Sequence, residues 1–176
     1  MRKILLDAWT AVVTEAMAHA LPQFSLVKSR LQGEERGLLK FEWVPKRPLK
    51  CGIAFRPLED AFDVWVGWST NGKFPYATAH ETPPPNGIWD FDHPAVVVPA
   101  ISLSGRTGSA AWNLWEPTDE QIDNPDSFAQ AFVEYSTRDL SSQEAQEIMM
   151  PLVAQAISEV RQYGLPYLQL RAVDQG

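Results

Sequence analysis

Alternating apolar and polar residues mark the middle of the chain. The segment "GLLKFEWVP" places Leu39, Phe41 and Trp43 on one side of an extended strand, with Lys40 and Glu42 on the other. The segments "KCGIAFRP" and "AFDVWVGWS" repeat this alternation. Short connections that contain proline separate the first two segments, and "PLED" separates the second from the third. The pattern therefore predicts an antiparallel meander of three strands.

Helical spacing of apolar residues precedes this meander. It is carried by Ile4, Leu5, Ala8, Val12 and Ala16. We therefore expect a helix from Leu5 to Ala20 that ends before Pro22. Asp7 and Glu15 interrupt the apolar run, and a signal-peptide core is continuous, so the segment fits a helix better than a signal peptide.

The last third of the chain is predicted to be mostly helical. A short helix over "NPDSFAQAFVEYS" has Pro125 near its first turn. A longer helix opens with a capping box from Ser141 to Glu144 and closes at Gly164. Pro151 inside it predicts a kink or a break. The final "PYLQLRAV" resembles one more strand.

Two further strands are expected over "AVVVPAISL" and "SAAWNLW". Residues 102–109, "SLSGRTGS", would form the hairpin turn between them, and Pro99 predicts that the first is an edge or bulged strand. The whole chain, residues 1–176, is then one α+β domain. Its antiparallel sheet of about five or six strands has the N-terminal and C-terminal helices packed on one face. The predicted core contains Leu5, Val12, Phe41, Trp43, Ile53, Phe55, Val64, Val66, Ile157 and Val160.

This element order and the aromatic strand "DVWVGWS" resemble those of small bacterial α+β domains of unknown function. Some of those domains act as immunity proteins, which neutralise toxins. The resemblance implies an interaction role and assigns no functional residue to this chain.

Composition agrees with a single domain. The chain has 176 residues, of which 45% are hydrophobic and 11% aromatic, enough for one core. Cys51 is the only cysteine, so an intrachain disulfide is impossible and a reducing, cytoplasmic compartment is expected. Its position beside Ile53 and Phe55 suits a buried, inert thiol. No segment approaches the ~20 apolar residues that span a bilayer.

Charge is divided unevenly along the chain. The net charge is −7, but residues 1–50 carry +4 and residues 51–176 carry −11. An acidic protein repels phosphates, so nucleic-acid binding is not expected. Glu116 to Glu159 hold ten Asp and Glu residues against Arg138 alone, a net charge of −9.

This acidic segment permits two interpretations. It is either the solvated face of surface helices or a surface that docks a basic protein. Tryptophans next to it offer aromatic anchors. The predicted partner-binding residues are Trp112, Trp115, Asp119, Glu120 and Asp123.

The stretch "ATAHETPPPNGIWDFDHPAVVV" is the main candidate for metal binding. Its possible ligands are His80, Glu81, Asp90, Asp92 and His93. These are suitable residue types, but the second histidine of an H-E-x-x-H motif is missing. A solvated loop with turn-capping carboxylates explains the same residues.

Motifs for other chemistry are absent. The chain has no G-x-S-x-G, and "SLSGRTGS" lacks the G-K-[ST] of a P-loop. We therefore expect a non-catalytic protein-interaction domain, of inhibitor or immunity type, with no cofactor. The alternatives are a metal-dependent enzyme that uses the His80–His93 loop, and a small-ligand pocket between the sheet and that loop.

Overall fold

The computed structural model describes residues 1–28, 36–72, 74–75, 95–104 and 111–174. Helix α1 spans Lys3–Ala20 and buries one stripe of side chains, Leu5, Ala8, Trp9, Val13 and Met17. This spacing of three and four residues is that of a single helical face. The helix ends at Ala20, as the sequence predicts, and Leu21 caps it directly before Pro22.

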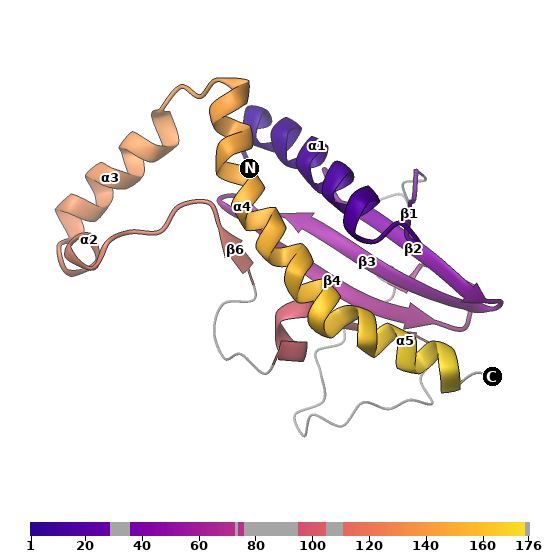
Figure 1. The fold of residues 1–176 in the computed structure, drawn as a ribbon. Coiled ribbons are helices and arrows are strands. Elements are labelled where there is room, and N and C mark those ends of the chain that lie inside the picture. The colour runs from indigo at the N-terminus through magenta and orange to yellow at the C-terminus, as the bar shows by residue number, and fades with distance from the viewer. Residues whose placement is uncertain (29–35, 73, 76–94, 105–110, 175–176) are drawn as a thin grey trace.

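The sheet is antiparallel and contains six strands, which are β1 (Ser25–Leu26), β2 (Leu39–Lys46), β3 (Leu49–Pro57), β4 (Ala61–Ser69), β5 (Ala95–Pro99) and β6 (Ala111–Asn113). Its order is β1-β2-β3-β4-β5, with β6 also paired to β4. The predicted meander is therefore confirmed as β2, β3 and β4 (Figure 1).

Cross-strand pairing explains why the alternation of apolar and polar residues predicts the strands correctly. Phe41 pairs with Ile53, Ile53 with Val66, and Val66 with Val98, which forms one apolar row across four strands. All four side chains are at most 2% exposed. The row lies on the face that the helices cover.

Strands β5 and β6 share one edge of β4. Strand β5 pairs with residues 65–69, and β6 pairs with residues 61–63. The two strands lie end to end and, within the described residues, do not pair with each other, so the expected hairpin between them is wrong. The edge position that Pro99 predicted for its strand is confirmed.

Four helices form the last third of the chain. They are α2 (Asp119–Asp123), α3 (Pro125–Thr137), α4 (Ser142–Glu159) and α5 (Leu165–Asp174). The capping box from Ser141 to Glu144 is present at the start of α4. Helix α4 continues through Pro151, so the predicted break is wrong.

The final strand predicted from "PYLQLRAV" is also wrong, because this segment is helix α5. A π turn, Val160–Gly164, carries the chain from α4 into α5, so Gly164 does not end the helix. Packing on the sheet favours a helix over a strand for this segment. The Trp68 Nε1 donates to the Tyr167 hydroxyl at 3.2 Å, and the Arg171 guanidinium lies 4.1 Å from the centre of the Trp68 ring. Tyr167 and Arg171 are one helical turn apart, so only a helix brings both onto Trp68.

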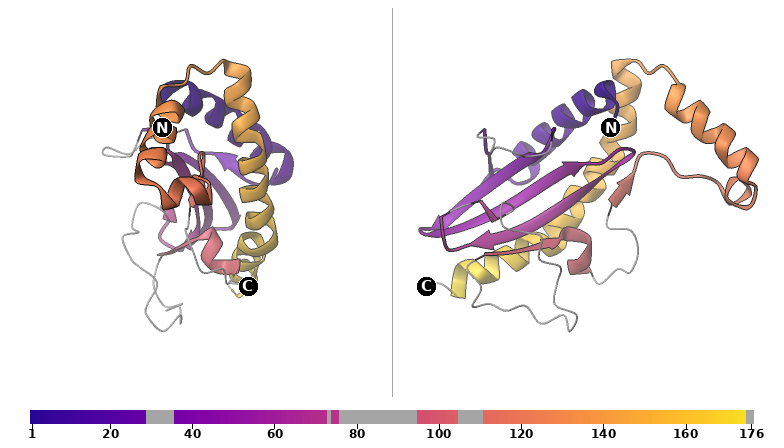
Figure 2. Two further views of the ribbon diagram at one scale, coloured as in Figure 1. Left: turned by 90° about the vertical axis from the view of Figure 1, so that its left-hand side faces the viewer. Right: turned by 180° about the vertical axis from the view of Figure 1, so that it is seen from behind.

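Helices α1 and α4 pack against each other on the same face of the sheet (Figures 1 and 2). Eight of the ten predicted core residues are buried there. The other two, Val12 and Trp43, are partly buried at the edge of the core. The α+β class and the placement of the helices are confirmed. No helix in the described part of the chain is long and apolar enough to cross a membrane.

Candidate interaction surface

Residues 114–141 form an extension that we call the arm. It leaves the end of β6, contains α2 and α3, and returns to the start of α4. Figures 1 and 2 show that it projects from the sheet and from the α1–α4 layer. Only its two ends, at Leu114 and Leu140, pack against the hydrophobic core.

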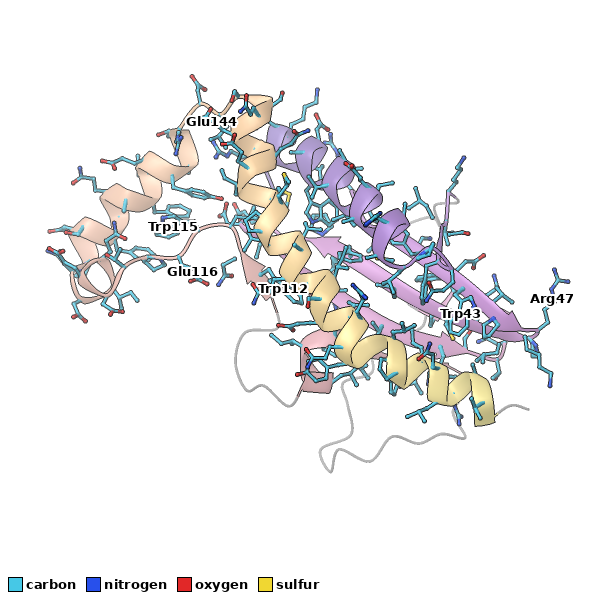
Figure 3. The ribbon with its side chains drawn as sticks, in the orientation of Figure 1. Trp43, Arg47, Trp112, Trp115, Glu116 and Glu144 are labelled. Carbon is cyan, nitrogen blue, oxygen red and sulfur yellow. The ribbon has the colours of Figure 1, made fainter. Side chains whose placement is uncertain are left out.

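Trp115 is the centre of a small aromatic cluster within the arm. Its ring centre lies 5.5 Å from that of Phe128, 5.7 Å from that of Phe132 and 5.7 Å from that of Tyr135. The three partners occupy one side of α3, at spacings of four and three residues. Figure 3 shows Trp115 between the incoming segment and α3. These contacts fold α3 back onto the segment that leads into it.

The cluster does not bury the arm. No residue of α2 or α3, both described in full, is buried. The large apolar side chains exposed on these helices are Ile122 at 61%, Phe128 at 39%, Phe132 at 38% and Val133 at 57%. Exposed apolar side chains that are gathered on one element are typical of a surface that binds another molecule.

The arm is also strongly acidic. It contains seven carboxylates, at Glu116, Asp119, Glu120, Asp123, Asp126, Glu134 and Asp139. Its single basic residue, Arg138, forms an ion pair with Glu144 at 2.8 Å. The net charge of residues 114–141 is therefore −6, close to that of the whole protein. Exposed apolar groups and negative charge share the same short element.

Local capping makes the arm helical despite its exposure. Thr118 and Gln121 form a reciprocal capping box at the start of α2. The Asn124 side chain accepts hydrogen bonds from the backbone N–H groups of Asp126 and Ser127 at the start of α3. These bonds satisfy N–H groups that a helix leaves unpaired at its first turn.

Two groups from the body hold the base of the arm. Arg2 donates from Nη1 to the carbonyl oxygens of Arg138 at 2.7 Å and Ser136 at 3.3 Å, and its guanidinium lies 5.5 Å from the centre of the Tyr135 ring. The Leu114 N–H donates to the Asp60 carbonyl oxygen at 2.9 Å. Burial raises the pKa of Tyr135, and the nearby Asp60 carboxylate raises it further.

The structure separates the two tryptophans that the sequence grouped as anchors. Trp112 is only 5% exposed, pairs through β6 with Phe62 and stacks on its ring at 5.5 Å. It belongs to the core, and a partner cannot reach it without opening β6. Trp115 belongs to the arm, and Asp119, Glu120 and Asp123 are exposed on α2.

The exposed apolar residues of the arm are not among the binding residues predicted from the sequence. Phe128 and Phe132 are four residues apart, the spacing of one helical face. That signal was available, but a helical apolar stripe indicates a core face as readily as a binding face. Exposure distinguishes the two, and exposure is a property of the folded structure.

The candidate metal ligands His80, Glu81, Asp90, Asp92 and His93 lie outside the described residues. In the part of the chain that is described, no group of three or more His, Cys, Asp or Glu residues could hold a metal ion. The metal site stays a prediction.

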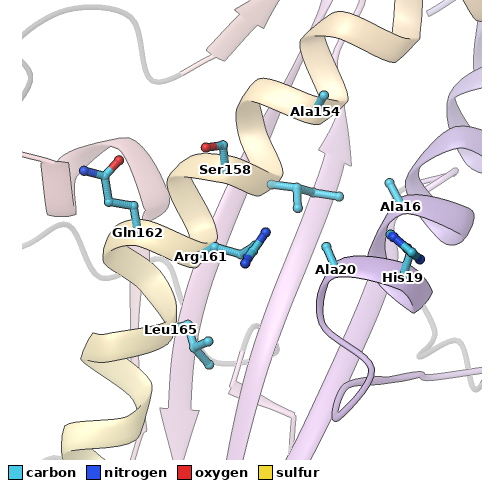
Figure 4. A pocket seen from close by; sticks show the side chains of 9 residues that line it. Ala16, His19, Ala20, Ala154, Ser158, Arg161, Gln162 and Leu165 are labelled. Carbon is cyan, nitrogen blue, oxygen red and sulfur yellow. The ribbon is translucent and has the colours of Figure 1, made fainter.

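A groove of about 560 Å³ lies between the C-terminal end of α1 and the second half of α4 (Figure 4). The side chains of Ala16, Ala20 and Ala154 line the groove and are too small to fill the space between the two helices. His19 and Arg161 supply polar groups at its side. The groove favours no second function.

Cys51 has no features of a nucleophile. It is fully buried on β3, and burial raises the pKa of its thiol from about 9 to about 12. A thiol that stays protonated is unreactive.

Comparisons with family models, curated proteins and solved structures give no match for this chain.

Proposed function

We propose that the protein is a non-catalytic interaction domain, of inhibitor or immunity type, that binds a basic protein through the arm. The observation that carries this proposal is the coincidence of four exposed large apolar side chains with a net charge of −6 on residues 114–141. Complementary charge raises the rate of association, and a few apolar anchors supply most of the binding energy. A cytoplasmic location and the absence of a cofactor are part of the same proposal.

The test uses surface plasmon resonance to measure association with the basic protein that a pull-down from the native lysate returns. One variant removes three arm charges through Asp119→Asn, Glu120→Gln and Asp123→Asn. A control removes three exposed charges outside the arm through Asp7→Asn, Glu15→Gln and Glu59→Gln, which gives the same net charge. We expect the arm variant to associate more slowly and the control to associate at nearly the native rate.

Salt provides a second readout. Raising ionic strength from 0.1 M to 1 M shortens the Debye length from about 10 Å to about 3 Å, so association of the native chain slows. The arm variant should depend less on salt. Equal association rates for the arm variant and the native chain at low salt would show that the arm charges only solvate the surface.

A further inference from the structure

The aromatic cluster of the arm is open on one side. Phe128 and Phe132 both contact Trp115, yet each leaves more than a third of its surface exposed. A helical face that carries aromatic rings one turn apart is usually covered by another element. In this protein, the contacts of α3 with α2 and with Trp115 leave both rings more than a third exposed.

The arm gains little helical stability from its own length. Helix α3 has 13 residues, and α2 has five. Isolated helices of about 12–15 residues are marginal in water, and most helical stability in proteins comes from packing of an apolar face. A covering element would therefore stabilise α3 as well as bind it.

We infer that the element that covers this face is an amphipathic helix with a basic polar side, supplied by the partner protein and lying along α3. This inference rests on the proposed function and specifies the partner. The apolar side of that helix would pack on Phe128 and Phe132, and its Lys and Arg residues would face the carboxylates of the arm.

Three properties of the arm favour this occupant. Phe128 and Phe132 project from one row of α3, and such rows pack into the grooves of a second helix. The net charge of −6 selects a basic sequence. A second copy of this chain is disfavoured, because two arms of the same charge would repel each other when packed together.

The length of α3 sets the size of the probe. Thirteen residues at 1.5 Å per residue give a helix about 20 Å long. The probe is a 16-residue helical peptide with Leu at helical spacing and Lys or Arg elsewhere. A second peptide has the same composition in strict alternation, which suits a strand. A third keeps the helical spacing and replaces each basic residue by Glu.

Calorimetric titration of the full chain measures the dissociation constant of each peptide. We expect the basic helical peptide to bind, and the alternating and acidic peptides to bind at least about tenfold more weakly. Combined Phe128→Ser and Phe132→Ser substitutions should weaken the binding of the basic helical peptide by a similar factor. Leu170→Ser is the matched control, because Leu170 is 67% exposed on α5 outside the arm, and it should leave binding unchanged.

Other results would overturn the inference. Equal binding of the alternating peptide would assign the surface to a strand, and unchanged binding by the Phe128/Phe132 variant would place the peptide elsewhere. The Phe128/Phe132 variant is uninformative if it loses helix α3 itself. In that case the variant with Asp119→Asn, Glu120→Gln and Asp123→Asn is the test. It should bind the basic helical peptide more weakly than the native chain does at low salt, and equal binding would overturn the inference. A basic protein that binds the arm through a non-helical segment would end this inference and leave the proposed function standing. Arm-independent association with the basic partner would end the proposed function.

Discussion

Arg2 ties the start of α1 to the end of α3, since its Nη1 donates to the Arg138 carbonyl oxygen at 2.7 Å although the two residues are 136 positions apart. The same guanidinium lies over the ring of Tyr135, which stacks on Trp115. The carbonyl oxygens at a helix C-terminus carry partial negative charge, so a cation there is favourable. The contacts of a single side chain thus reach from the body to the centre of the arm.

Replacement of Arg2 by Gln should loosen the arm. A hydrogen bond from a charged group contributes about 1.5–3 kcal/mol when it is sheltered, and less when it is partly exposed as here. We expect amide hydrogens of α3 to exchange faster, with little change in exchange from the sheet. Lys3→Gln removes an equal, exposed charge from the next position and should leave the hydrogen exchange of α3 unchanged. Equal exchange of α3 in both variants would contradict the role of Arg2.

Replacement of Trp115 by Ala should unfold the arm and spare the body. Each of its three aromatic contacts is expected to contribute about 0.5–1.5 kcal/mol, and no residue of α2 or α3 is buried to compensate. Far-UV circular dichroism should show a loss of helix while the melting temperature of the body changes little. Trp43→Ala removes a ring that packs on Phe24 outside the arm. It should lower the melting temperature of the body and leave the helix content of the arm unchanged. A large drop in melting temperature for Trp115→Ala would place this residue in the main core.

The main elements could be predicted because their patterns agree with their surroundings. Strands β2, β3 and β4 place alternate apolar residues such as Phe41, Ile53 and Val66 on the helical face, where these residues are buried, and α1 buries residues at helical spacing. The segment that became α5 carries both patterns: "YLQL" alternates, yet Leu165, Leu168 and Ala172 also fit a helix. The contacts of Tyr167 and Arg171 with Trp68 resolve this ambiguity, and they join residues about a hundred positions apart.

The candidate site was predicted only in part. Local charge is visible in a sequence, so the acidic segment that contains Asp119, Glu120 and Asp123 was identified. Whether each tryptophan lies in the core or in the arm could not be predicted from the sequence, because it depends on strand pairing. Trp115 follows Trp112 by only three positions, yet only Trp112 lies within a strand that pairs with β4.

Cys51 should make stability depend on alkaline pH. The thiol ionises near pH 9 in the unfolded chain and near pH 12 in the folded one. Between these values the unfolded state binds fewer protons, so the free energy of unfolding falls as pH rises, by up to about 1.4 kcal/mol per unit. This contribution is fully present below pH 9. Urea unfolding at pH 8 and pH 10 measures it.

Cys51→Ala is the control for this pH dependence. It retains Tyr135 and Tyr167, whose raised pKa values act in the same direction, and it removes only the thiol. The difference in stability between pH 8 and pH 10 should be smaller in this variant. An equal difference in both proteins would mean that the folded thiol ionises like an exposed one. Native Cys51 should also resist alkylation at pH 8.

Gly67 allows β5 to approach β4 closely. A Cβ at this position would lie 2.4 Å from the carbonyl oxygen of Val96, which is closer than van der Waals contact permits. Gly67→Ala should therefore force the strands apart and lower the free energy of unfolding by about 1–3 kcal/mol. Gly72 has a φ of +74° and open space around it, so Gly72→Asn is the control. Asn tolerates this conformation and should change stability little. Equal melting temperatures for Gly67→Ala and the native chain would show that the edge strand moves freely.

The arm meets the core only at its two ends, and this arrangement has an evolutionary consequence. Substitutions along α2 and α3 escape the packing constraints that restrict residues such as Phe62 and Val66, because no neighbour in the core must change with them. Selection on partner choice can then act on these residues without destabilising the body of the protein. Related chains should therefore diverge fastest in the arm and retain the sheet and the α1–α4 layer, and a transplanted arm should carry its specificity to a new host.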